Sequence, residues 1–411
     1  MKCKIPQKQL VAALKTIKTS KALGKFDNDE EICLRILLDK DNNKVEFIAS
    51  NIGVWVGSSI ESADFVKEDN PNEIFEVEES GEMFIEAREF ISLIETFPSD
   101  CILQMSREEK KEIDNFTVSI LKSKQEGKKK SISFLSVIKP KFFETSPPEE
   151  KRKRITVSGK EISKAVNSVE FASEVDTSRQ HLWGIQVEIF GEKDISACTT
   201  DTYRICWYDK EGTSRDGESK TVTPIKSSFV SALKCLDQKQ DVHLDIGDKY
   251  TVLSQGGQWH GVPNAIQVGE DAMPEWRAIA SSLKRRCRKH VDVPRKALLD
   301  CLKTATLTAG GRYGLRINFN SKEKHIVISV DSIGENCAVS SYMSETEPLD
   351  DECFSGEIED SVTFRAEHLK EIVGKFGSDS IRFHLQGSDQ TVMITDENED
   401  FQYISSVVRS I

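Results

Sequence analysis

The residues best placed to do chemistry in this chain are Thr199, Thr200 and Asp201, followed closely by Arg204. A hydroxyl beside a carboxylate could form a nucleophile or a metal ligand set. The flanking letters favour a simpler interpretation, because strand-like runs at Ile195–Cys198 and at Arg204–Trp207 leave only a turn between them. In such a turn, the carboxylate of Asp201 caps local backbone donors. We therefore expect a structural turn here and not a catalytic centre.

No other pattern in the sequence indicates an enzyme, a metal site or a cofactor. The seven histidines are scattered, and none belongs to an HxxxH or HExxH helix. Gly310-Gly311 lacks the lysine and hydroxyl residue of a phosphate-binding loop. The ten cysteines form no CxxC pair, and Cys33, Cys198 and Cys206 stand in apolar runs, which predicts buried free thiols.

The compartment predicted from these features is the cytoplasm. Unpaired thiols are typical of a reducing environment. The first residues, MKCKIPQKQL, lack an apolar signal region, and no apolar run approaches the roughly 18 residues that span a bilayer. The sequence therefore predicts neither a membrane anchor nor a membrane partner.

The elements that position these residues follow a long internal repeat. Six helices share apolar residues at relative positions 0, 1, 4 and 7, with one polar exception in each of two of them. The first set lies at Leu10–Ile17, Ile162–Val169 and Leu298–Ala305, and the second set at Phe90–Phe97, Phe229–Leu236 and Leu369–Phe376. The first set recurs after 152 and 136 residues and the second after 139 and 140. A period of that length repeats a whole domain.

Alternating strands accompany every helix, so the predicted fold class is α+β. Strands are expected at Lys2–Ile5, Arg154–Val157 and His290–Val293 before the first-set helices, and at Ile102–Met105, Val242–Ile246 and Ile381–Leu385 after the second-set helices. Each domain thus has two half-units of sheet and helix. The predicted domains are residues 1–148, 152–284 and 288–411, with linkers at Pro147-Pro148 and at the basic stretch Lys284–Lys289.

The charge distribution separates the helices from the rest of the chain. The net charge is −12, with acidic clusters such as 27–31 and 76–82, whereas the first-set helices carry lysines and arginines. An acidic exterior with basic helices would repel DNA except at one chosen surface. The alternative is that these lysines only solvate helix faces. The lysine-rich segment 122–130 has the same two interpretations, a solvated turn or a loop that touches DNA.

Several segments resemble, in order and spacing, the bacterial DNA polymerase III β sliding clamp family. The run Ala197-Cys198-Thr199-Thr200-Asp201-Thr202-Tyr203-Arg204-Ile205 resembles the Ala-Thr-Asp-Gly-His-Arg-Leu run of the family's second domain. The lead-in 179–184 (RQHLWG) resembles Arg-Tyr-Tyr-Leu-Asn-Gly, and 273–277 (MPEWR) resembles Phe-Pro-Asp-Tyr-Arg. The tail 403–411 is similar in position to the Met-Pro-Met-Arg-Leu ending, so the resemblance covers the whole chain.

The resemblance implies three tandem DNA-clamp domains that form half of a six-domain ring. Such a ring is a head-to-tail homodimer that encircles double-stranded DNA without regard to sequence and tethers the replicative DNA polymerase, with a clamp loader as a further partner. The charge pattern of the first-set helices predicts that Lys8, Lys15, Lys18, Lys21, Lys160, Lys164, Arg295, Lys296 and Lys303 face DNA. The resemblance adds Lys25, Gln180 and His181. The implied dimer interface joins the region of Ile132 to that of Leu307.

The family also binds short apolar peptides in a groove between domains 2 and 3. Carried over to this sequence, the groove residues are Leu182, Thr200, Thr202, Tyr203, Arg204, Ile205, Pro274, Ile279, Ile404, Ser406, Val408 and Arg409. An apolar concavity with a few polar anchors suits peptide capture. The alternative is that these are ordinary residues of a domain junction.

The departures from the family pattern concern the groove. The family's Gly-His is Thr202-Tyr203 here, its junction arginine is Ala278, and its Met-Pro-Met is 406–408 (SVV) with Ile411 added. We therefore expect a divergent clamp, of a phage or another mobile element, whose groove binds a different peptide. The alternatives are a scaffold of the replication machinery that never closes into a ring and an enzyme accessory subunit or hydrolase that borrowed the repeat.

Overall fold

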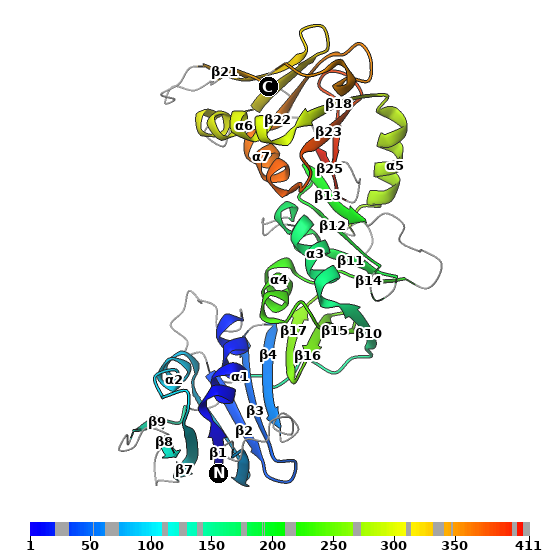
Figure 1. The fold of residues 1–411 in the computed structure, drawn as a ribbon. Coiled ribbons are helices and arrows are strands. Elements are labelled where there is room, and N and C mark those ends of the chain that lie inside the picture. Colours follow the sequence, from blue (N-terminus) through cyan, green and yellow to red (C-terminus); the bar gives the residue numbers. More distant parts are fainter. Residues whose placement is uncertain are drawn as a thin grey trace. The chain divides into compact units, whose positions relative to one another are not determined.

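Strands and helices follow one another in the order that the repeat predicts (Figure 1). The computed structural model describes residues 1–20, 33–51, 53–61, 74–108, 114–122, 130–137, 143–173, 179–190, 192, 194–209, 219–265, 273–309, 314–331, 341–346, 348–396 and 401–405. All strand pairs in these ranges are antiparallel. The fold class is α+β, as predicted.

The six predicted helices are confirmed, and each follows a strand. In the first set, β1 (Lys2–Pro6) leads into α1 (Gln7–Thr19), β10 (Lys153–Ser158) into α3 (Gly159–Val169), and β18 (Lys289–Pro294) into α6 (Arg295–Ala309). In the second set, β6 (Gly81–Glu86) leads into α2 (Ala87–Ile94), β14 (Lys220–Val222) precedes α4 (Lys226–Cys235), and β22 (Glu359–Arg365) leads into α7 (Ala366–Lys375). The predicted apolar positions are buried in every helix, apart from the half-buried Val11 and Leu299 and the exposed Lys370.

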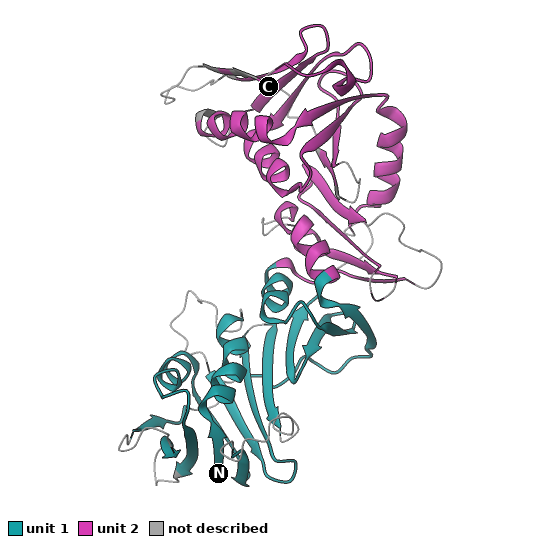
Figure 2. Ribbon diagram, in the orientation of Figure 1, with its two compact units in different colours: residues 1–160, 227–264 teal, residues 161–226, 265–411 magenta. Residues whose placement is uncertain are grey.

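The chain divides into two compact units that do not coincide with the three predicted domains. Unit 1 contains residues 1–160 and 227–264, and unit 2 contains residues 161–226 and 265–411 (Figure 2). Both units thus draw on the central repeat. The boundaries at 148–152 and 284–288 stay a prediction.

Unit 1 contains two sheets. The smaller has the order β5-β1-β7-β8-β9, in which β5 is Glu76–Glu79, β7 is Ile102–Glu108, β8 is Asn115–Lys122 and β9 is Ser131–Leu135. The larger has the order β10-β15-β16-β17-β4-β3-β2-β6, in which β15 is Asp241–Ile246, β16 is Tyr250–Gln255, β17 is Gln258–Pro263, β4 is Val54–Glu61, β3 is Lys44–Asn51 and β2 is Cys33–Asp39. Strand β9 stands at one end of the smaller sheet.

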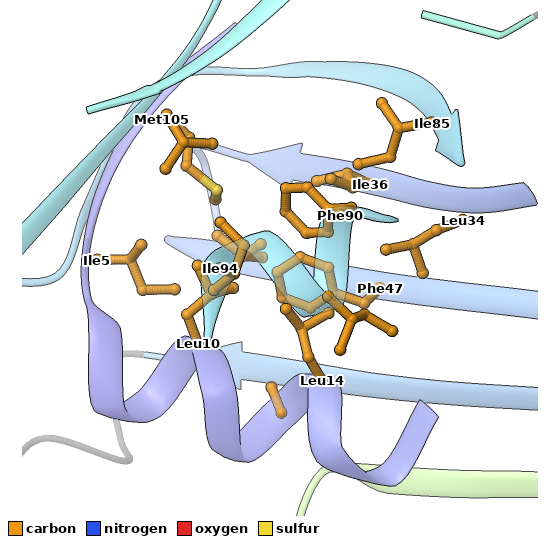
Figure 3. Close-up of a cluster of buried hydrophobic side chains, with 14 of the residues drawn as sticks. Ile5, Leu10, Leu14, Leu34, Ile36, Phe47, Ile85, Phe90, Ile94 and Met105 are labelled. Atoms are coloured by element: carbon orange, nitrogen blue, oxygen red, sulfur yellow. The ribbon is translucent and has the colours of Figure 1, made fainter. Parts of the chain in front are cut away.

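The core of unit 1 lies where α1 and α2 pack on strands of both sheets (Figure 3). Leu10 and Leu14 of α1 and Phe90 and Ile94 of α2 are at most 1% exposed. They meet Phe47 and its neighbours on the strands. Each fully buried side chain of this size contributes about 1.5–3 kcal/mol, so the helices are held by the sheets and not by their own propensity.

The pair β4–β17 joins the first repeat to the second. Trp259 lies opposite Gly57, and His260 lies opposite Val56. A Cβ at Gly57 would collide with the Trp259 indole, so the absence of a side chain lets the ring lie across the neighbouring strand. This pairing connects residues about two hundred positions apart in the sequence.

Unit 2 also contains two sheets. The larger has the order β14-β11-β12-β13-β25-β24-β23-β18, in which β11 is Gln186–Ile189, β12 is Ile195–Thr200, β13 is Arg204–Asp209, β25 is Phe401–Ser405, β24 is Val392–Asp396 and β23 is Ser380–Leu385. The smaller has the order β21-β20-β19-β22, in which β21 is Ser341–Glu345, β20 is His325–Asp331 and β19 is Gly314–Asn320. Strand β21 stands at one end of the smaller sheet, and α6 packs against α7, β20 and β21.

The strand pairings recur in all three repeats, as the helices do. The strand before each first-set helix pairs with the strand after the corresponding second-set helix, as β1–β7, β10–β15 and β18–β23. The order β1-β7-β8-β9 of the first repeat corresponds to β10-β15-β16-β17 of the second and β18-β23-β24-β25 of the third. Likewise β6-β2-β3-β4 corresponds to β14-β11-β12-β13 and β22-β19-β20-β21. Sheet topology therefore supports three copies of one unit.

The basic stretch Lys284–Lys289, predicted as a linker, contains the end of a helix and the start of a strand. Residues Trp276–Arg286 form a seventh helix, α5, and β18 begins at Lys289, so the basic stretch ends a helix and starts a strand. Its buried residues are Trp276, Ala280 and Leu283, a helical spacing that the sequence contained. The pattern was missed because α5 stands outside the threefold repeat.

The prediction of buried thiols at Cys33, Cys198 and Cys206 is confirmed. Cys33, Cys198 and Cys206 are buried, and the nine cysteines within the described ranges are free thiols. Burial raises the pKa of the Cys198 and Cys206 thiols far above the usual value. No group of three metal-binding side chains occurs among the described residues. None of the described helices is long and apolar enough to cross a membrane.

We predict that unit 1 loses stability in acid through His260. Its imidazole is 2% exposed, Nε2 has no hydrogen-bond partner among the described residues, and burial lowers its pKa to about 4. The unfolded chain therefore takes up a proton near pH 6.5 that the folded chain refuses until about pH 4. The stability present above pH 6.5 should fall by about 3 kcal/mol as the pH drops to 4.

The measurement is chemical denaturation at several pH values, followed for the wild type and for His260→Phe. The variant should lack this part of the acid slope, whereas the control His243→Gln, which changes an exposed imidazole, should keep it. An identical slope in His260→Phe and the wild type would show that another group is responsible.

Candidate functional site

The turn between β12 and β13 is the centre of the candidate site, and its geometry is fixed by Asp201. The backbone N–H groups of Tyr203 and Arg204 each donate to Oδ1 of Asp201 at 3.0 Å. The Thr200 hydroxyl donates to the Arg204 carbonyl at 2.6 Å. Thr202 occupies the left-handed region at φ 72°, where a β-branched residue is strained unless its surroundings hold it. The predicted structural role of Asp201 is confirmed.

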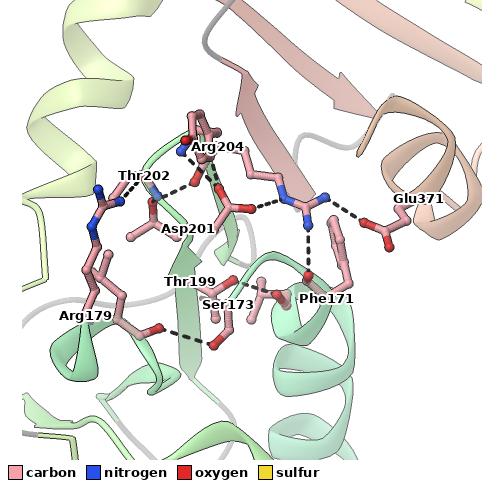
Figure 4. Close-up of polar contacts among 12 residues, drawn as sticks. Phe171, Ser173, Arg179, Thr199, Asp201, Thr202, Arg204 and Glu371 are labelled. Carbon is pink, nitrogen blue, oxygen red and sulfur yellow. Dashed lines mark hydrogen bonds and ion pairs between the residues drawn. The ribbon is translucent and has the colours of Figure 1, made fainter. Parts of the chain in front are cut away.

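The guanidinium of Arg204 ties this turn to two other elements of unit 2 (Figure 4). Nε donates to Oδ2 of Asp201 at 2.8 Å, Nη1 to Glu371 of α7 at 2.7 Å, and Nη2 to the carbonyl of Phe171 at 3.1 Å. Phe171 lies in η3 (Glu170–Ala172), and its ring faces the same guanidinium at 5.2 Å. Only a planar donor with several N–H groups can serve three such acceptors at once.

Electrostatics keep Arg204 charged although its side chain is only 7% exposed. Burial alone would lower its pKa, but Tyr403, the hydrogen bond to Glu371 and the carboxylate of Asp201 together hold the pKa above the usual value. Both oxygens of Asp201 are occupied by these contacts. This arrangement stabilises the turn and leaves no free carboxylate oxygen for acid–base chemistry.

A second arginine holds the segment that precedes the turn. Nη1 of Arg179 donates to the hydroxyl of Thr202 at 2.7 Å (Figure 4). Arg179 stands before η4 (Gln180–Leu182), and the hydroxyl of Ser173 donates to the Leu182 carbonyl at 3.3 Å. The buried Leu182 is thereby placed beside the turn.

Three predicted apolar groove residues meet in one cluster of unit 2. Ile205 of β13 lies opposite Ile404 of β25, and Ile279 of α5 packs against the same cluster. The cluster also contains Trp207 and Trp276, whose ring centroids are 5.6 Å apart. The sequence resemblance therefore selected residues from three elements that the fold brings together.

The remaining groove residues have mixed positions. Thr200 is buried, Pro274 is half-buried and Tyr203 is 47% exposed. Ser406, Val408 and Arg409 lie outside the described residues. The assignment of all these residues to a peptide groove stays a prediction.

Lysines predicted to face DNA lie on the exposed faces of their helices. Lys8 and Lys15 of α1, Lys160 and Lys164 of α3, and Lys296 of α6 are exposed, opposite the buried apolar stripes. Lys21 and Lys25 lie outside the described residues. An exposed lysine suits both interpretations of the sequence, so the DNA contacts stay a prediction.

Other residues of that set have protein partners. Lys18 forms an ion pair with Glu95 at 2.7 Å and Lys303 with Asp300 at 2.7 Å, both at the surface. Arg295 donates from Nε to the carbonyl of Val373 at 3.0 Å, near the end of α7, where a cation suits the helix dipole. Gln180 is exposed and His181 half-buried in η4.

Sequence analysis missed a group of charged residues beside the turn. Lys226 at the start of α4, Arg365 before α7 and His368 in α7 line a cavity of about 470 Å³ together with Tyr203 and Arg204. These residues are far apart in the chain and belong to no local motif. Only their meeting in unit 2 marks them as a site.

Comparison with known proteins places this geometry in a family context. Residues 156–260 match the family model of the DNA polymerase III beta subunit, central domain. The full chain is similar to the crystal structure of the DNA polymerase III subunit beta from Pseudomonas aeruginosa, with 14% identity, 100% of both chains covered and a TM-score of 0.79. The DNA polymerase sliding clamp from Bacillus subtilis gives 16%, 100% of both chains and 0.78. The beta subunit from Streptococcus pyogenes gives 16%, 100% of both chains and 0.75.

No curated protein matches the chain. At these identities the structural likeness shows the fold, which is that of the sliding clamps along the whole chain. The family match of the central segment, residues 156–260, agrees with that fold.

We predict that Arg204→Ala destabilises unit 2 by about 3–5 kcal/mol, because it leaves the buried carboxylate of Asp201 without its cation. The control is Glu371→Gln, which removes the half-exposed partner of the same guanidinium and should cost less than about 1 kcal/mol. Chemical denaturation of both variants provides the measurement. Equal losses would show that Arg204 does not hold the turn through Asp201.

Proposed function

We propose that this chain is a divergent member of the DNA polymerase III β-subunit family and acts as a DNA sliding clamp, a processivity factor of the cytoplasm with no enzymatic activity. Two chains would close head to tail into a ring around duplex DNA, onto which a clamp loader would place them. The replicative polymerase would be tethered through the groove beside Arg204. The strongest support is the pairing of consecutive repeats, because it indicates which strand edges a second chain would pair with.

Each repeat has one strand that pairs with the next repeat. Strand β4 of the first repeat pairs with β17 of the second, and the corresponding β13 of the second pairs with β25 of the third. The corresponding strand of the third repeat is β21, and the strand of the first repeat that corresponds to β17 and β25 is β9. Both stand at the ends of their sheets, with open hydrogen-bonding edges as described. We infer that β21 of one chain pairs with β9 of another.

Exposed apolar side chains at these ends support the same pairing. Met343 of β21 is 68% exposed and Leu135 of β9 is 63% exposed, whereas Ile404 in the formed β13–β25 pair is only 4% exposed. Burying them would stabilise the contact. Repetition of one head-to-tail contact gives a closed ring when its rotation closes. The family resemblance sets the number of chains at two.

Contacts between helices of consecutive repeats indicate the same dimer contact independently. Thr19 at the end of α1 contacts Cys235 of α4, with 3.1 Å between Oγ1 and Sγ, and Phe171 after α3 lies 5.8 Å from Nζ of Lys375 in α7. The repeat offsets relate Thr19 to Phe171 and then to Leu307 of α6, and they relate Lys375 to Cys235 and then to Thr96 after α2. The third pair of the series would therefore be Leu307 and Thr96. Leu307 is 83% exposed, as expected of a residue whose partner belongs to a second chain.

We predict that the chain sediments at about twice its mass of 46.3 kDa and that Leu307→Glu weakens the dimer roughly 100-fold, since a charge replaces a leucine that the proposed contact would bury. Analytical ultracentrifugation over a concentration series measures both. The control Ile74→Glu changes an exposed apolar residue before β5, away from the β9 edge, and should leave the dimer intact. A wild-type chain that stays monomeric at micromolar concentration would favour the scaffold alternative.

The basic helices supply the interaction with DNA in this proposal. Lys8 and Lys15 are two helical turns apart on one exposed face of α1 and have no ion pair with the described residues. Lysines facing a duplex give an attraction that is independent of sequence and sensitive to salt. Topological closure of the ring would provide retention, so these contacts can stay weak enough for sliding.

We predict that Lys8→Glu/Lys15→Glu lowers the affinity for a short duplex by tenfold or more at low salt and reduces the salt dependence by about one counterion for each lost contact. Fluorescence anisotropy with a labelled duplex at several salt concentrations measures both quantities. Lys40→Glu/Lys249→Glu is the matched control, because it makes the same charge change at exposed positions in strand-connecting turns of unit 1. Equal effects of the two double variants would show that only net charge matters and that α1 does not face DNA.

A further inference from the structure

The cavity beside Arg204 contains more cations than its own carboxylates can pair. Of the two acidic residues that line it, Asp201 and Glu371, both are already bound to the guanidinium of Arg204. Two further cations, Lys226 and Arg365, line the same cavity. Neither has an ion pair with any residue within the described ranges. The cavity therefore presents positive charge that no carboxylate of the described residues pairs directly.

The position of Lys226 makes this lack costly. Its side chain is half-buried, and burial lowers its pKa. Attraction by the carboxylates of Glu170, Glu371 and Asp201 offsets the lost hydration of the ammonium group only in part, because the pKa still falls. A bound anion would supply the missing partner. His368, whose pKa burial and Arg204 lower to about 4, is neutral near pH 7 and would not add charge.

The second cation is combined with an aromatic surface. The guanidinium of Arg365 lies 3.7 Å from the ring centroid of Tyr203, which is 47% exposed. Stacking orients the guanidinium and keeps its N–H edge available to an acceptor. Tyr203 thus presents an aromatic surface next to a cation, and the apolar cluster of Ile205, Ile279 and Ile404 begins two residues further along β13.

We infer that this cavity, which we name the basic pocket, binds the carboxylate of an aspartate or glutamate in the partner peptide whose apolar side chains occupy the groove. This inference rests on the proposed function, since it identifies the chemistry of the peptide that the clamp captures. Lys226 and Arg365 would hold the carboxylate, and Tyr203 would contact the neighbouring apolar residue. A carboxylate held by charged donors forms the stronger class of hydrogen bond.

A peptide fits these observations better than a nucleic acid. A cavity of about 470 Å³ has the size of a small-ligand site and can take side chains of a short peptide. The phosphates of a duplex are fixed on a rigid helical surface, whereas a carboxylate on a flexible side chain can enter a concavity.

The test is selection of a random displayed peptide library on the immobilised full-length chain. We expect the selected peptides to combine apolar residues with an aspartate or glutamate at a fixed spacing. Selection on Lys226→Ser/Arg365→Ser should keep the apolar residues and lose the acidic one. The matched control is Lys322→Ser/Arg316→Ser, which removes the same two residue types from exposed positions of unit 2 and should keep both features.

A measurement on the wild-type chain makes the test independent of how the variants fold. A selected peptide and its Glu→Gln or Asp→Asn analogue are compared by fluorescence anisotropy, and the analogue should bind about tenfold more weakly. Equal affinity would overturn the inference.

The outcomes separate this inference from the proposed function. Apolar peptides without an acidic residue would leave the groove standing and overturn the basic pocket. A library that yields no binding peptide would overturn both. Loss of duplex binding in Lys226→Ser/Arg365→Ser, without any acidic preference among the peptides, would make the pocket a phosphate contact and also overturn the inference.

Discussion

Antiparallel pairing between consecutive repeats is the interaction on which the architecture depends. In the β4–β17 and β13–β25 pairs, backbone groups of one repeat are satisfied by the next, and the resulting sheets extend across the repeats. A backbone N–H or C=O buried without a partner costs free energy comparable to a lost hydrogen bond. One repeat alone would leave such an edge open. Stacking of repeats therefore satisfies backbone groups as well as packing side chains.

The same requirement connects the fold to the proposed ring. Every joined edge carries side chains that fit it, such as Gly57 beneath the Trp259 indole and Ile205 opposite Ile404. The corresponding outer edges, β9 and β21, carry the exposed Leu135 and Met343 instead. A chain of three repeats has one such edge at each end of the series, and a second copy offers the complementary edge. In the proposed ring, closure extends an interaction that each chain already uses twice.

Arg204 connects the β12–β13 turn to other elements of unit 2. Its three acceptors come from the turn itself, from η3 and from α7, so one side chain connects parts of the second and third repeats. Because the buried Asp201 and Arg204 satisfy one another, the turn stays ordered while Tyr203 remains exposed beside it. In the proposed clamp, a rigid turn next to an apolar cluster would provide a preorganised surface for a short peptide and so reduce the ordering cost of binding.

The sequence by itself determined the elements and their repetition. The apolar spacing in the six predicted helices and the alternation in their strands are local consequences of burying one face, and the structure has these elements where the spacing placed them. The capping role of Asp201 is equally local, since its acceptors and donors lie within three residues. The resemblance to the β clamps also found Ile205, Ile279 and Ile404, which the fold brings into one cluster.

The tertiary structure alone decided the contacts between distant segments. The choice of which strands pair, as in Trp259 opposite Gly57, involves residues about two hundred positions apart. The alternation of apolar and polar residues along a strand does not specify its partner strand. The meeting of Lys226, Arg365 and Tyr203 around one cavity has no sequence pattern either, because the three residues come from separate elements. Helix α5 differs, because its buried residues follow a local helical spacing in the sequence. It was not predicted since it has no counterpart among the described residues of the other repeats. Local burial fixes the elements, whereas long-range pairing fixes the site.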